Sequence, residues 1–280
     1  MPQITLPQAT IDYRELGPQD SPHPPVVFVH GALVDSRLWT VVANQLAEQG
    51  FRCILPNWPL GAHTIAVNDR SILSPPGVAE LIHDFLVALD LQDVTLVGND
   101  TGGGLCQFLI DAHPERIGRL VLTNCDAFDK FPPFPFNAVF ALMRSRLSVR
   151  ALMALMRPTA LRHSAVGFGL LANNLDGDLT ASWLHPASTD SRIAGDFAAL
   201  ARGIGRIDLT DVAPRLHRFT KPVTLVWGTA DRCFTPGLGE RLGALFPDAT
   251  MIKVPGAKTF VALDNPSAVI DAIAQVSART

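Results

Sequence analysis

The feature of this sequence with the clearest chemistry is an aspartate in a glycine-rich turn. Gly98 and Gly102 flank Asp100, and the turn lies between the apolar run Val94–Val97 and a segment with helical periodicity. Small residues two positions before and after Asp100 let a strand and a helix approach closely around a strained turn. A carboxylate held there could attack a carbon atom as a nucleophile or transfer a proton as a general acid or base. Asp100 is therefore the predicted central residue of a reaction site.

A glycine-rich turn between a strand and a helix can also bind phosphate, so a nucleotide loop is the competing interpretation. The turn around Asp100 lacks the lysine and the Ser/Thr of a P-loop, and its glycines do not fit a Gly-x-Gly-x-x-Gly spacing. The turn also follows a late predicted strand instead of the first one. We therefore predict no nucleotide, and no other pattern in the chain indicates a cofactor.

Two further aspartates follow predicted strands and are candidate partners of Asp100. Asp231 comes shortly after the apolar run Val223–Trp227, and Asp126 comes shortly after the run Leu120–Leu122. The carboxyl ends of parallel strands meet at one edge of a sheet, so either aspartate could lie near Asp100. The choice between Asp231, which we favour, and Asp126 stays open.

Apolar β-branched runs alternate with amphipathic segments through the first half of the chain. Such runs, bounded by proline or glycine, are typical of strands buried on both faces of a parallel sheet. The predicted fold class is therefore α/β, with a mostly parallel sheet flanked by helices. The predicted strands are Val26–Val29, Phe51–Leu55, Val94–Val97, Leu120–Leu122, Val223–Trp227 and Thr250–Val254, with Thr5–Leu16 as an antiparallel edge. The predicted helices are Ser36–Gln49, Gly77–Leu89, Gly102–Ala112, Leu238–Leu245 and a last helix from Pro266.

The composition changes near residue 127. The segment Phe131–Phe136 alternates phenylalanine with proline, which excludes a central strand and a helix interior. The chain beyond it is rich in Leu, Met and Ala and has helical character up to about residue 219. We predict an inserted helical cap over residues 127–219, and a core formed by residues 1–126 and 220–280. The apolar cap predicts a small hydrophobic substrate or ligand.

The overall composition excludes several function classes. The 280 residues carry a formal net charge of −3, so the chain lacks the basic excess that nucleic-acid binding needs. The N-terminus has no signal-peptide pattern and no segment has the pattern of a membrane span, so we expect a cytoplasmic protein without a membrane partner. The four cysteines stand apart without metal-ligand spacing, so no metal is expected. The mean hydropathy of +0.22 leaves a homodimer open.

At the turn around Asp100 the chain resembles the α/β-hydrolase superfamily, in which this turn is the nucleophile elbow. A second similarity is His30-Gly31-Ala32, directly after the first predicted central strand. In that family the corresponding segment shapes the oxyanion hole, so the resemblance implies the backbone N–H groups of Ala32 and Thr101 as donors. It also implies an α/β-hydrolase fold with an inserted helical cap.

An aspartate at the elbow is similar to the branch of haloalkane dehalogenases and epoxide hydrolases, where a carboxylate attacks carbon and forms an ester. The spacing from the His-Gly pair to Trp39 is also dehalogenase-like. The chain departs from this branch at Thr101 and Ala32, where dehalogenases carry tryptophan or a halide-binding residue. The only tyrosine, Tyr13, lies in the leading segment, whereas epoxide hydrolases use tyrosines of the cap.

The largest departure lies near the C-terminus. The family delivers its general base on a Pro-Gly-x-x-His loop, and here Thr259 stands in the histidine position after Pro255-Gly256. A threonine hydroxyl has no useful basicity near neutral pH, so hydrolysis of an ester on Asp100 would lack its base. His63 is the favoured replacement base. Other residues expected to line the substrate pocket or reach into the cleft are His30, Trp39, His163, Trp183, His185 and Lys258.

Two functional hypotheses follow from these residues. The first is an enzyme for a small hydrophobic substrate, with Asp100 as nucleophile or general acid/base, in a reaction of dehalogenase, esterase or epoxide hydrolase type or in a non-hydrolytic derivative. The second is a catalytically silenced relative that binds a ligand in the same pocket. Loss of the imidazole favours the second, and retention of a strained acidic turn with its glycines favours the first.

Overall fold

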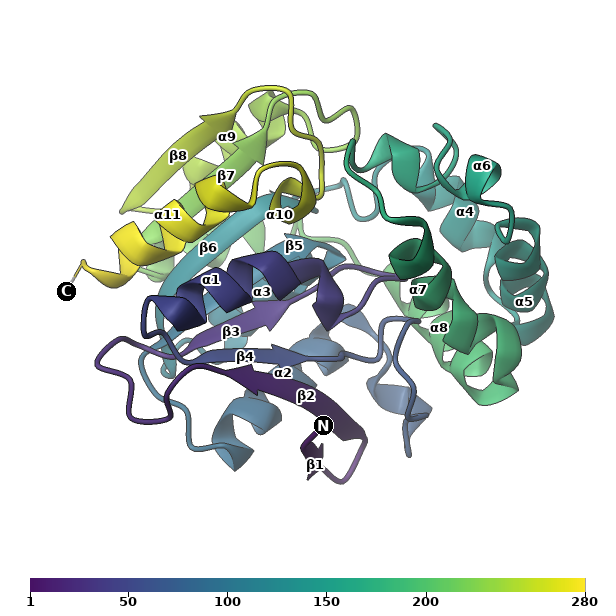
Figure 1. The fold of residues 1–280 in the computed structure, drawn as a ribbon, viewed down its shortest axis with the longest axis horizontal. Coiled ribbons are helices and arrows are strands. Elements are labelled where there is room, and N and C mark those ends of the chain that lie inside the picture. The colour runs from purple at the N-terminus through teal and green to yellow at the C-terminus, as the bar shows by residue number, and fades with distance from the viewer. Residues whose placement is uncertain (280) are drawn as a thin grey trace.

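Apolar runs of the sequence form the central strands of a sheet in the computed structural model, which describes residues 1–279 (Figure 1). Every residue of β3 (Val26–Val29) is buried, and so is every residue of β5 (Val94–Asp100) except Asp100. Strands buried on both faces are what a parallel sheet covered by helices requires. The other strands are β1 (Gln3–Thr5), β2 (Thr10–Leu16), β4 (Cys53–Pro56), β6 (Ile117–Cys125), β7 (Val223–Gly228) and β8 (Ala249–Val254).

Residues 1–279 contain one eight-stranded sheet with the order β1-β2-β4-β3-β5-β6-β7-β8. The strands from β4 to β8 run parallel, and β2 pairs antiparallel with β4. The prediction of a mostly parallel sheet with helices is confirmed, and so is the antiparallel edge. The edge strand β2 is shorter than the predicted segment Thr5–Leu16, and β1 ends at the first residue of that segment. β5 lies in the middle of the sheet, so the residue that ends it is surrounded by neighbouring strands.

Helices cover both faces of the sheet. In Figure 1, α1 and α11 lie against each other in front of the sheet, while α2 and α3 pack together behind it. A further helix, α9, packs against β7 and β8. The bounds of the five helices are α1 (Thr40–Glu48), α2 (Pro75–Ala88), α3 (Thr101–Ala112), α9 (Pro236–Gly243) and α11 (Pro266–Ser277).

One predicted helix begins with a shorter element, and the last helix begins at Pro266 as predicted, after a separate short helix. The segment predicted as Ser36–Gln49 starts as a 3-10 turn over Ser36–Trp39, because the side chain of Asp35 accepts a hydrogen bond from the Arg37 backbone and caps that turn. The last helix is preceded by α10 (Val261–Asp264), because Pro266 keeps the residue before it out of the helical conformation.

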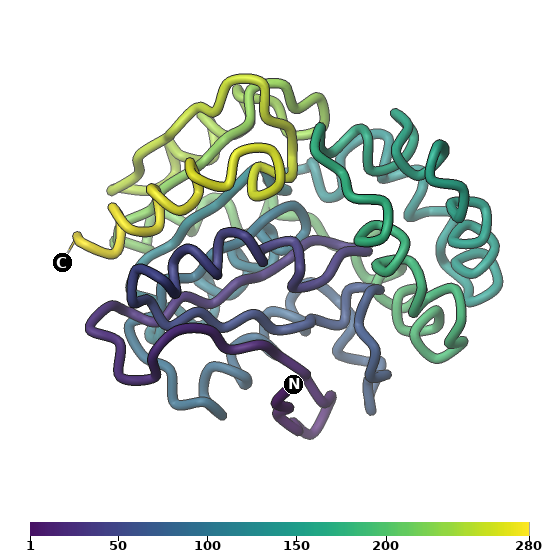
Figure 2. The backbone as a smooth tube through the Cα atoms, viewed as in Figure 1, coloured from purple at the N-terminus to yellow at the C-terminus, as the bar shows by residue number. Residues whose placement is uncertain are grey.

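A group of helices between β6 and β7 forms what we call the helical insert. Figures 1 and 2 show its teal and green segments beside the carboxyl ends of the central strands. Buried polar contacts join it to the core: Asp196 accepts a hydrogen bond from Arg70 at 2.6 Å, and Trp183 Nε1 donates to Asp35 Oδ1 at 3.0 Å. The division into domains at residues 127 and 219 stays a prediction. The insert consists of α4 (Phe136–Leu142), α5 (Arg146–Leu155), α6 (Thr159–Arg162), α7 (Gly177–Thr189) and α8 (Ser191–Ile204).

None of the helices in the described part of the chain combines the length and the apolar character that crossing a bilayer needs.

Candidate active site

Asp100 lies at the sharp turn between β5 and α3. Its backbone has φ 53° and ψ −131°, and α3 begins at the next residue, Thr101. A residue with a side chain costs about 1–3 kcal/mol in such a conformation, so the surrounding structure must hold it there. The strained strand-to-helix turn that the sequence predicts is therefore present.

The glycines beside Asp100 are required by close packing. A Cβ atom added to Gly98 would lie 2.7 Å from Cys106 Sγ, and one added to Gly102 would lie 2.4 Å from the carbonyl oxygen of Val29. Both distances are shorter than nonbonded atoms tolerate, so no side chain fits at either position. The two glycines allow β3, β5 and α3 to meet at Asp100.

One carboxylate oxygen of Asp100 lies against the His30-Gly31-Ala32 segment. A Cβ atom on Gly31 would stand 2.2 Å from Asp100 Oδ2, so only glycine leaves room for this oxygen. The backbone N–H groups of Thr101 and Ala32 both favour the ionised carboxylate. These are the two donors predicted to form the oxyanion hole, and the structure places both beside Asp100.

The pKa of Asp100 is raised to about 7. Burial is the largest cause, because loss of water disfavours the charged form. The N–H group of Thr101 lowers the pKa, the charge of Asp231 raises it, and the N–H group of Ala32 lowers it. A carboxyl group with a pKa near 7 can both accept and donate a proton at neutral pH.

A mainly apolar cavity of about 90 Å³ lies next to Asp100. The core contributes Asp100, Thr101, Ala32 and Leu33 to its wall. The rest of the wall comes from the segment after β6 and from the helical insert, and its residues are Pro132, Phe136, Val139, Phe140, Met143, Leu152, Met153, Met156, Arg162, Val166, Gly167, Phe168, Leu171 and Leu184.

The one basic side chain of this wall, among the residues that the structure describes, is Arg162. It is only 3% exposed, and its guanidinium donates to Thr180 Oγ1, Thr159 Oγ1 and the carbonyl oxygens of Met156, Arg157 and Gly177. All five N–H groups are thereby used within the insert. Arg162 therefore holds α6 and α7 together and contributes positive charge to the wall without a free donor.

Thr259 stands in direct contact with Asp231. Its hydroxyl Oγ1 donates to Asp231 Oδ2 at 2.7 Å, and both residues are buried. The backbone carbonyl of Thr259 accepts from Asn99 Nδ2 at 2.8 Å, which ties this loop to the residue before Asp100. A hydroxyl thus occupies the position beside the acid in which the resemblance places an imidazole.

Asp231 is held by hydrogen bonds on both carboxylate oxygens. Asn124 Nδ2 donates to Oδ2 at 2.8 Å, and the backbone N–H groups of Cys233 and Phe234 donate to Oδ1 at 2.7 and 3.0 Å. Burial raises the pKa of Asp231, and the bonds from Phe234, Thr259, Cys233 and Asn124 lower it in that order. The loop after β7 is therefore built to hold a carboxylate.

Asp126 has a different environment. It is fully buried, and neither of its carboxylate oxygens has a hydrogen-bond partner within residues 1–279. Burial, followed by the charge of Asp100, raises its pKa well above the ordinary value, while the Thr101 side chain lowers it. Asp126 contacts neither Thr259 nor the cavity, so the geometry favours Asp231 as the acid partner.

The side chains expected in the pocket lie elsewhere, and this corrects the sequence analysis. His30 is buried and accepts from the Trp58 backbone at 2.9 Å, and burial lowers its pKa to about 4. Trp39 is buried in the core beside Phe28. Within residues 1–279, none of the six residues His30, Trp39, His63, Trp183, His185 and Lys258 lines the Asp100 cavity.

The predicted base His63 and the pocket candidate Lys258 are also engaged in other contacts. His63 Nε2 lies 3.4 Å from Asp196 Oδ2 in a buried contact that joins the core to the insert. Lys258 Nζ donates to the carbonyl oxygen of Gly169 at 2.8 Å. Trp183 is hydrogen-bonded to Asp35, and His163 is hydrogen-bonded to Thr180. His185 is exposed on α7. Each of these side chains has a structural partner or faces solvent, so the replacement base is none of them in this conformation.

Sequence reasoning missed the residues that form most of the site. Asn124 holds Asp231 and also bonds both the carbonyl and the N–H group of Gly228, but an asparagine inside a strand gave no hint of this role. The composition of the insert predicted that it is apolar, but it did not identify which of its apolar residues line the cavity. A helical pattern shows that one face is buried, but it does not show which residues face a cavity.

Comparisons with known proteins agree with this geometry. A family model described as alpha/beta hydrolase fold matches residues 24–266. Haloalkane dehalogenase 2 of Mycobacterium bovis is 27% identical over 269 residues, which cover 89% of this chain and 86% of that protein. A 2-hydroxy-6-oxononadienedioate/2-hydroxy-6-oxononatrienedioate hydrolase of Cupriavidus pinatubonensis is 25% identical over 236 residues, which cover 81% of this chain and 77% of that protein.

Among solved structures, a thermophilic esterase from Thermogutta terrifontis has a TM-score of 0.74 at 18% identity, covering 98% of this chain and 97% of that one. At this identity the likeness concerns the fold. The family model covers most of the chain, and the sheet, the elbow and the flanking helices follow the same plan. The chain therefore belongs to the alpha/beta hydrolase fold family.

Proposed function

We propose that this protein is an enzyme that acts on a small apolar substrate, with the carboxyl group of Asp100 as its reacting group. The observation that carries the proposal is the position of Asp100. Among the residues described, it is the one carboxyl group in the wall of an otherwise mainly apolar cavity. A concave apolar site with one convergent polar group of shifted pKa is the usual form of an active site.

The position of the two oxygens supports nucleophilic attack. Oδ2 lies against Gly31, and the N–H groups of Ala32 and Thr101 lie beside the carboxylate. In the proposal the other oxygen faces a substrate in the cavity that Asp100 lines. In the proposed reaction a bond forms between this oxygen and a substrate carbon, while the bond to the leaving group breaks and the leaving group departs with the electron pair. The similarity to a haloalkane dehalogenase supports this class of electrophile.

Thr259 decides what happens to the resulting ester. General base catalysis typically contributes 10²–10⁴-fold, and a hydroxyl that donates to Asp231 cannot supply it. Hydrolysis of an ester on Asp100 would then be slow, and the covalent adduct would accumulate.

Proton transfer is the second candidate, and the pKa of Asp100 favours it. A carboxyl group with a pKa of about 7 exchanges protons readily at neutral pH, as an isomerisation or elimination requires. Such a reaction needs no ester and therefore no base at position 259.

Intact-protein mass spectrometry distinguishes these candidates. The protein is incubated with alkyl halides, epoxides and activated esters, beside Asp100→Asn and the matched surface variant Asp20→Asn. Nucleophilic attack predicts a mass increase in the parent and in Asp20→Asn, and none in Asp100→Asn. An adduct of the same size on Asp100→Asn would place the reaction on another residue and would overturn the role of Asp100 as nucleophile.

A second variant tests the role of position 259. Thr259→His restores an imidazole beside Asp231, so the adduct should disappear with time and the alcohol product should be released over many turnovers. A parent that forms no adduct and converts no substrate, together with a Thr259→His variant that gains nothing, contradicts the nucleophilic mechanism. Ligand binding without turnover in both the parent and Thr259→His would then support the hypothesis of a catalytically inactive protein that binds a ligand.

A further inference from the structure

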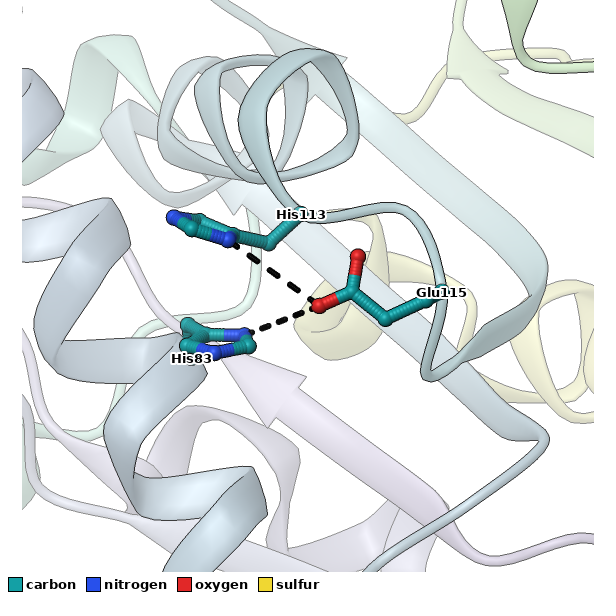
Figure 3. A group of neighbouring side chains, drawn as sticks. All are labelled: His83, His113 and Glu115. Carbon is teal, nitrogen blue, oxygen red and sulfur yellow. Dashed lines mark ion pairs between the residues drawn. The ribbon is translucent and has the colours of Figure 1, made fainter.

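Two histidines and a glutamate that lie apart in the sequence meet at the surface of the core. His83 lies on α2, His113 follows the last residue of α3, and Glu115 lies in the loop before β6 (Figure 3). The ligand atoms of the three side chains lie within 4.8 Å of one another. His83 Nδ1 is 3.7 Å from Glu115 Oε1, and His113 Nδ1 is 4.0 Å from the same oxygen.

A fourth residue orients one of the imidazoles. Glu80 Oε2 lies 2.7 Å from His113 Nε2, so the carboxylate accepts a hydrogen bond from the N–H group at that ring nitrogen. In a neutral ring this leaves the lone pair on Nδ1, which is the nitrogen that faces Glu115. A carboxylate that holds the outer nitrogen of a histidine is the usual support of a metal-binding imidazole.

We propose that His83, His113 and Glu115 bind a zinc ion, with Glu80 as the outer partner of His113. Two neutral imidazoles and one carboxylate are ligands that zinc accepts, and water would complete a tetrahedron. Calcium and magnesium prefer sites made of oxygen ligands, so they fit this set poorly.

Glu115 already lies near the spacing that zinc requires. Bonds of about 2.1 Å in a tetrahedron separate neighbouring ligand atoms by roughly 3.4 Å, so Glu115 Oε1 must approach each histidine by a few tenths of an ångström. The ligand atoms of the two histidines lie within 4.8 Å of each other. The two rings are stacked, with centroids 4.1 Å apart and an angle of 23° between their planes. In-plane lone pairs of stacked rings do not converge, so one ring must turn. Glu80 holds His113, and His83 is therefore the ring that turns.

The site lies far from Asp100. The 12 residues of α3 separate Asp100 at one end from His113 at the other, which is about 18 Å along the helix. Zinc here would join α2, which packs against α3, to the segment between α3 and β6. Its expected effect is on the stability of the fold, and it takes no part in the chemistry of Asp100. The inference is therefore independent of the proposed function.

Isothermal titration calorimetry of untagged, chelator-treated full-length protein with zinc chloride tests the proposal. Saturable binding of one zinc per chain is expected for the parent and for the control His217→Asn, which changes an exposed histidine away from the site. His83→Asn and His113→Asn should abolish this binding. Glu80→Gln should weaken it by about tenfold or more, because it removes the outer carboxylate. Magnesium chloride should give no binding.

Thermal unfolding provides the second measurement. Zinc should raise the Tm of the parent and of His217→Asn and leave that of His83→Asn unchanged, because an ion that binds only the folded state stabilises it. Circular dichroism without zinc checks that each variant folds, as expected for side chains at the surface. Equal zinc binding by the parent and His83→Asn would overturn the proposal, and so would the absence of saturable binding by the parent.

Discussion

Two buried carboxyl groups follow neighbouring strands of the sheet, and their surroundings are opposite. Asp231, after β7, accepts hydrogen bonds from the side chains of Asn124 and Thr259 and from two backbone N–H groups. Asp126, after β6, has no partner for either oxygen in the part of the chain that the structure describes. The same residue type in equivalent places of the sheet thus accepts four hydrogen bonds in one case. In the other case the nearby Thr101 side chain lowers the pKa, but no donor among residues 1–279 lies within normal hydrogen-bond geometry.

The path of the chain after each aspartate explains the difference. After Asp231 the backbone turns back, so the N–H groups of Cys233 and Phe234 face its carboxylate, as in other turns that begin with aspartate. After Asp126 the chain leaves for the helical insert, and no such turn forms around the carboxylate. A buried carboxylate is stable as a charge only where donors surround it, so the comparison favours Asp231 as the group that stays ionised.

The largest effect is expected at Asp231. Replacing it with alanine leaves four donors without their acceptor in a buried site, including those of Asn124 and Thr259. The free energy of unfolding should fall by about 3–5 kcal/mol, as when one partner of a buried polar network is removed. Urea denaturation at pH 5 measures this loss. A loss below about 1 kcal/mol would contradict the view that the β7 loop depends on its carboxylate.

A smaller effect is expected at Thr259. Thr259→Val keeps the shape of the side chain but removes the hydroxyl that donates to Asp231, and should cost about 2 kcal/mol in the same denaturation experiment. Thr259→Ser keeps the hydroxyl and loses one buried methyl group, which should cost about 1 kcal/mol. The comparison predicts that valine is the more damaging change. If serine destabilises more than valine, packing of the methyl group outweighs the hydrogen bond.

Asp126 should show the smallest effect, with the opposite sign. Because burial raises its pKa, the folded chain retains a proton on Asp126 that the unfolded chain releases above the ordinary aspartate pKa of about 3.9. The stability of the parent therefore falls as the pH rises above that value. Asp126→Asn removes this penalty, so it should stabilise the protein by about 1 kcal/mol at pH 5, and by more at higher pH.

Thermal unfolding of the parent and of Asp126→Asn between pH 4 and pH 8 measures this difference. The difference between the two proteins should be smallest at pH 4, where the unfolded chain still keeps about half of the protons on Asp126, and it should grow as the pH rises. A variant that is less stable than the parent across the whole range would show that Asp126 is ionised and held by donors, and the contrast with Asp231 would disappear.

Much of the fold and the centre of the site could be predicted from the sequence. The strand at Val94, the turn at Asp100 and the helix after it follow from patterns within a few neighbouring residues. The hydroxyl of Thr259 lies beside Asp231 in the structure, and its place in the position of a catalytic histidine stays a prediction. The pocket residues were predicted wrongly, as His30 and His63 show, because a histidine in a loop near the site can turn its ring toward other partners.

The sequence by itself therefore determined the sheet, the glycines around Asp100 and the threonine at position 259. Continuous apolar runs, glycine sterics and residue identity involve only a few neighbouring residues, so they can be recognised in the sequence alone. The tertiary structure alone decided which apolar residues surround the cavity, that Asp231 has four donors and Asp126 none, and that His83, His113 and Glu115 meet. These features join residues far apart in the chain, and their positions follow from packing that no local pattern records.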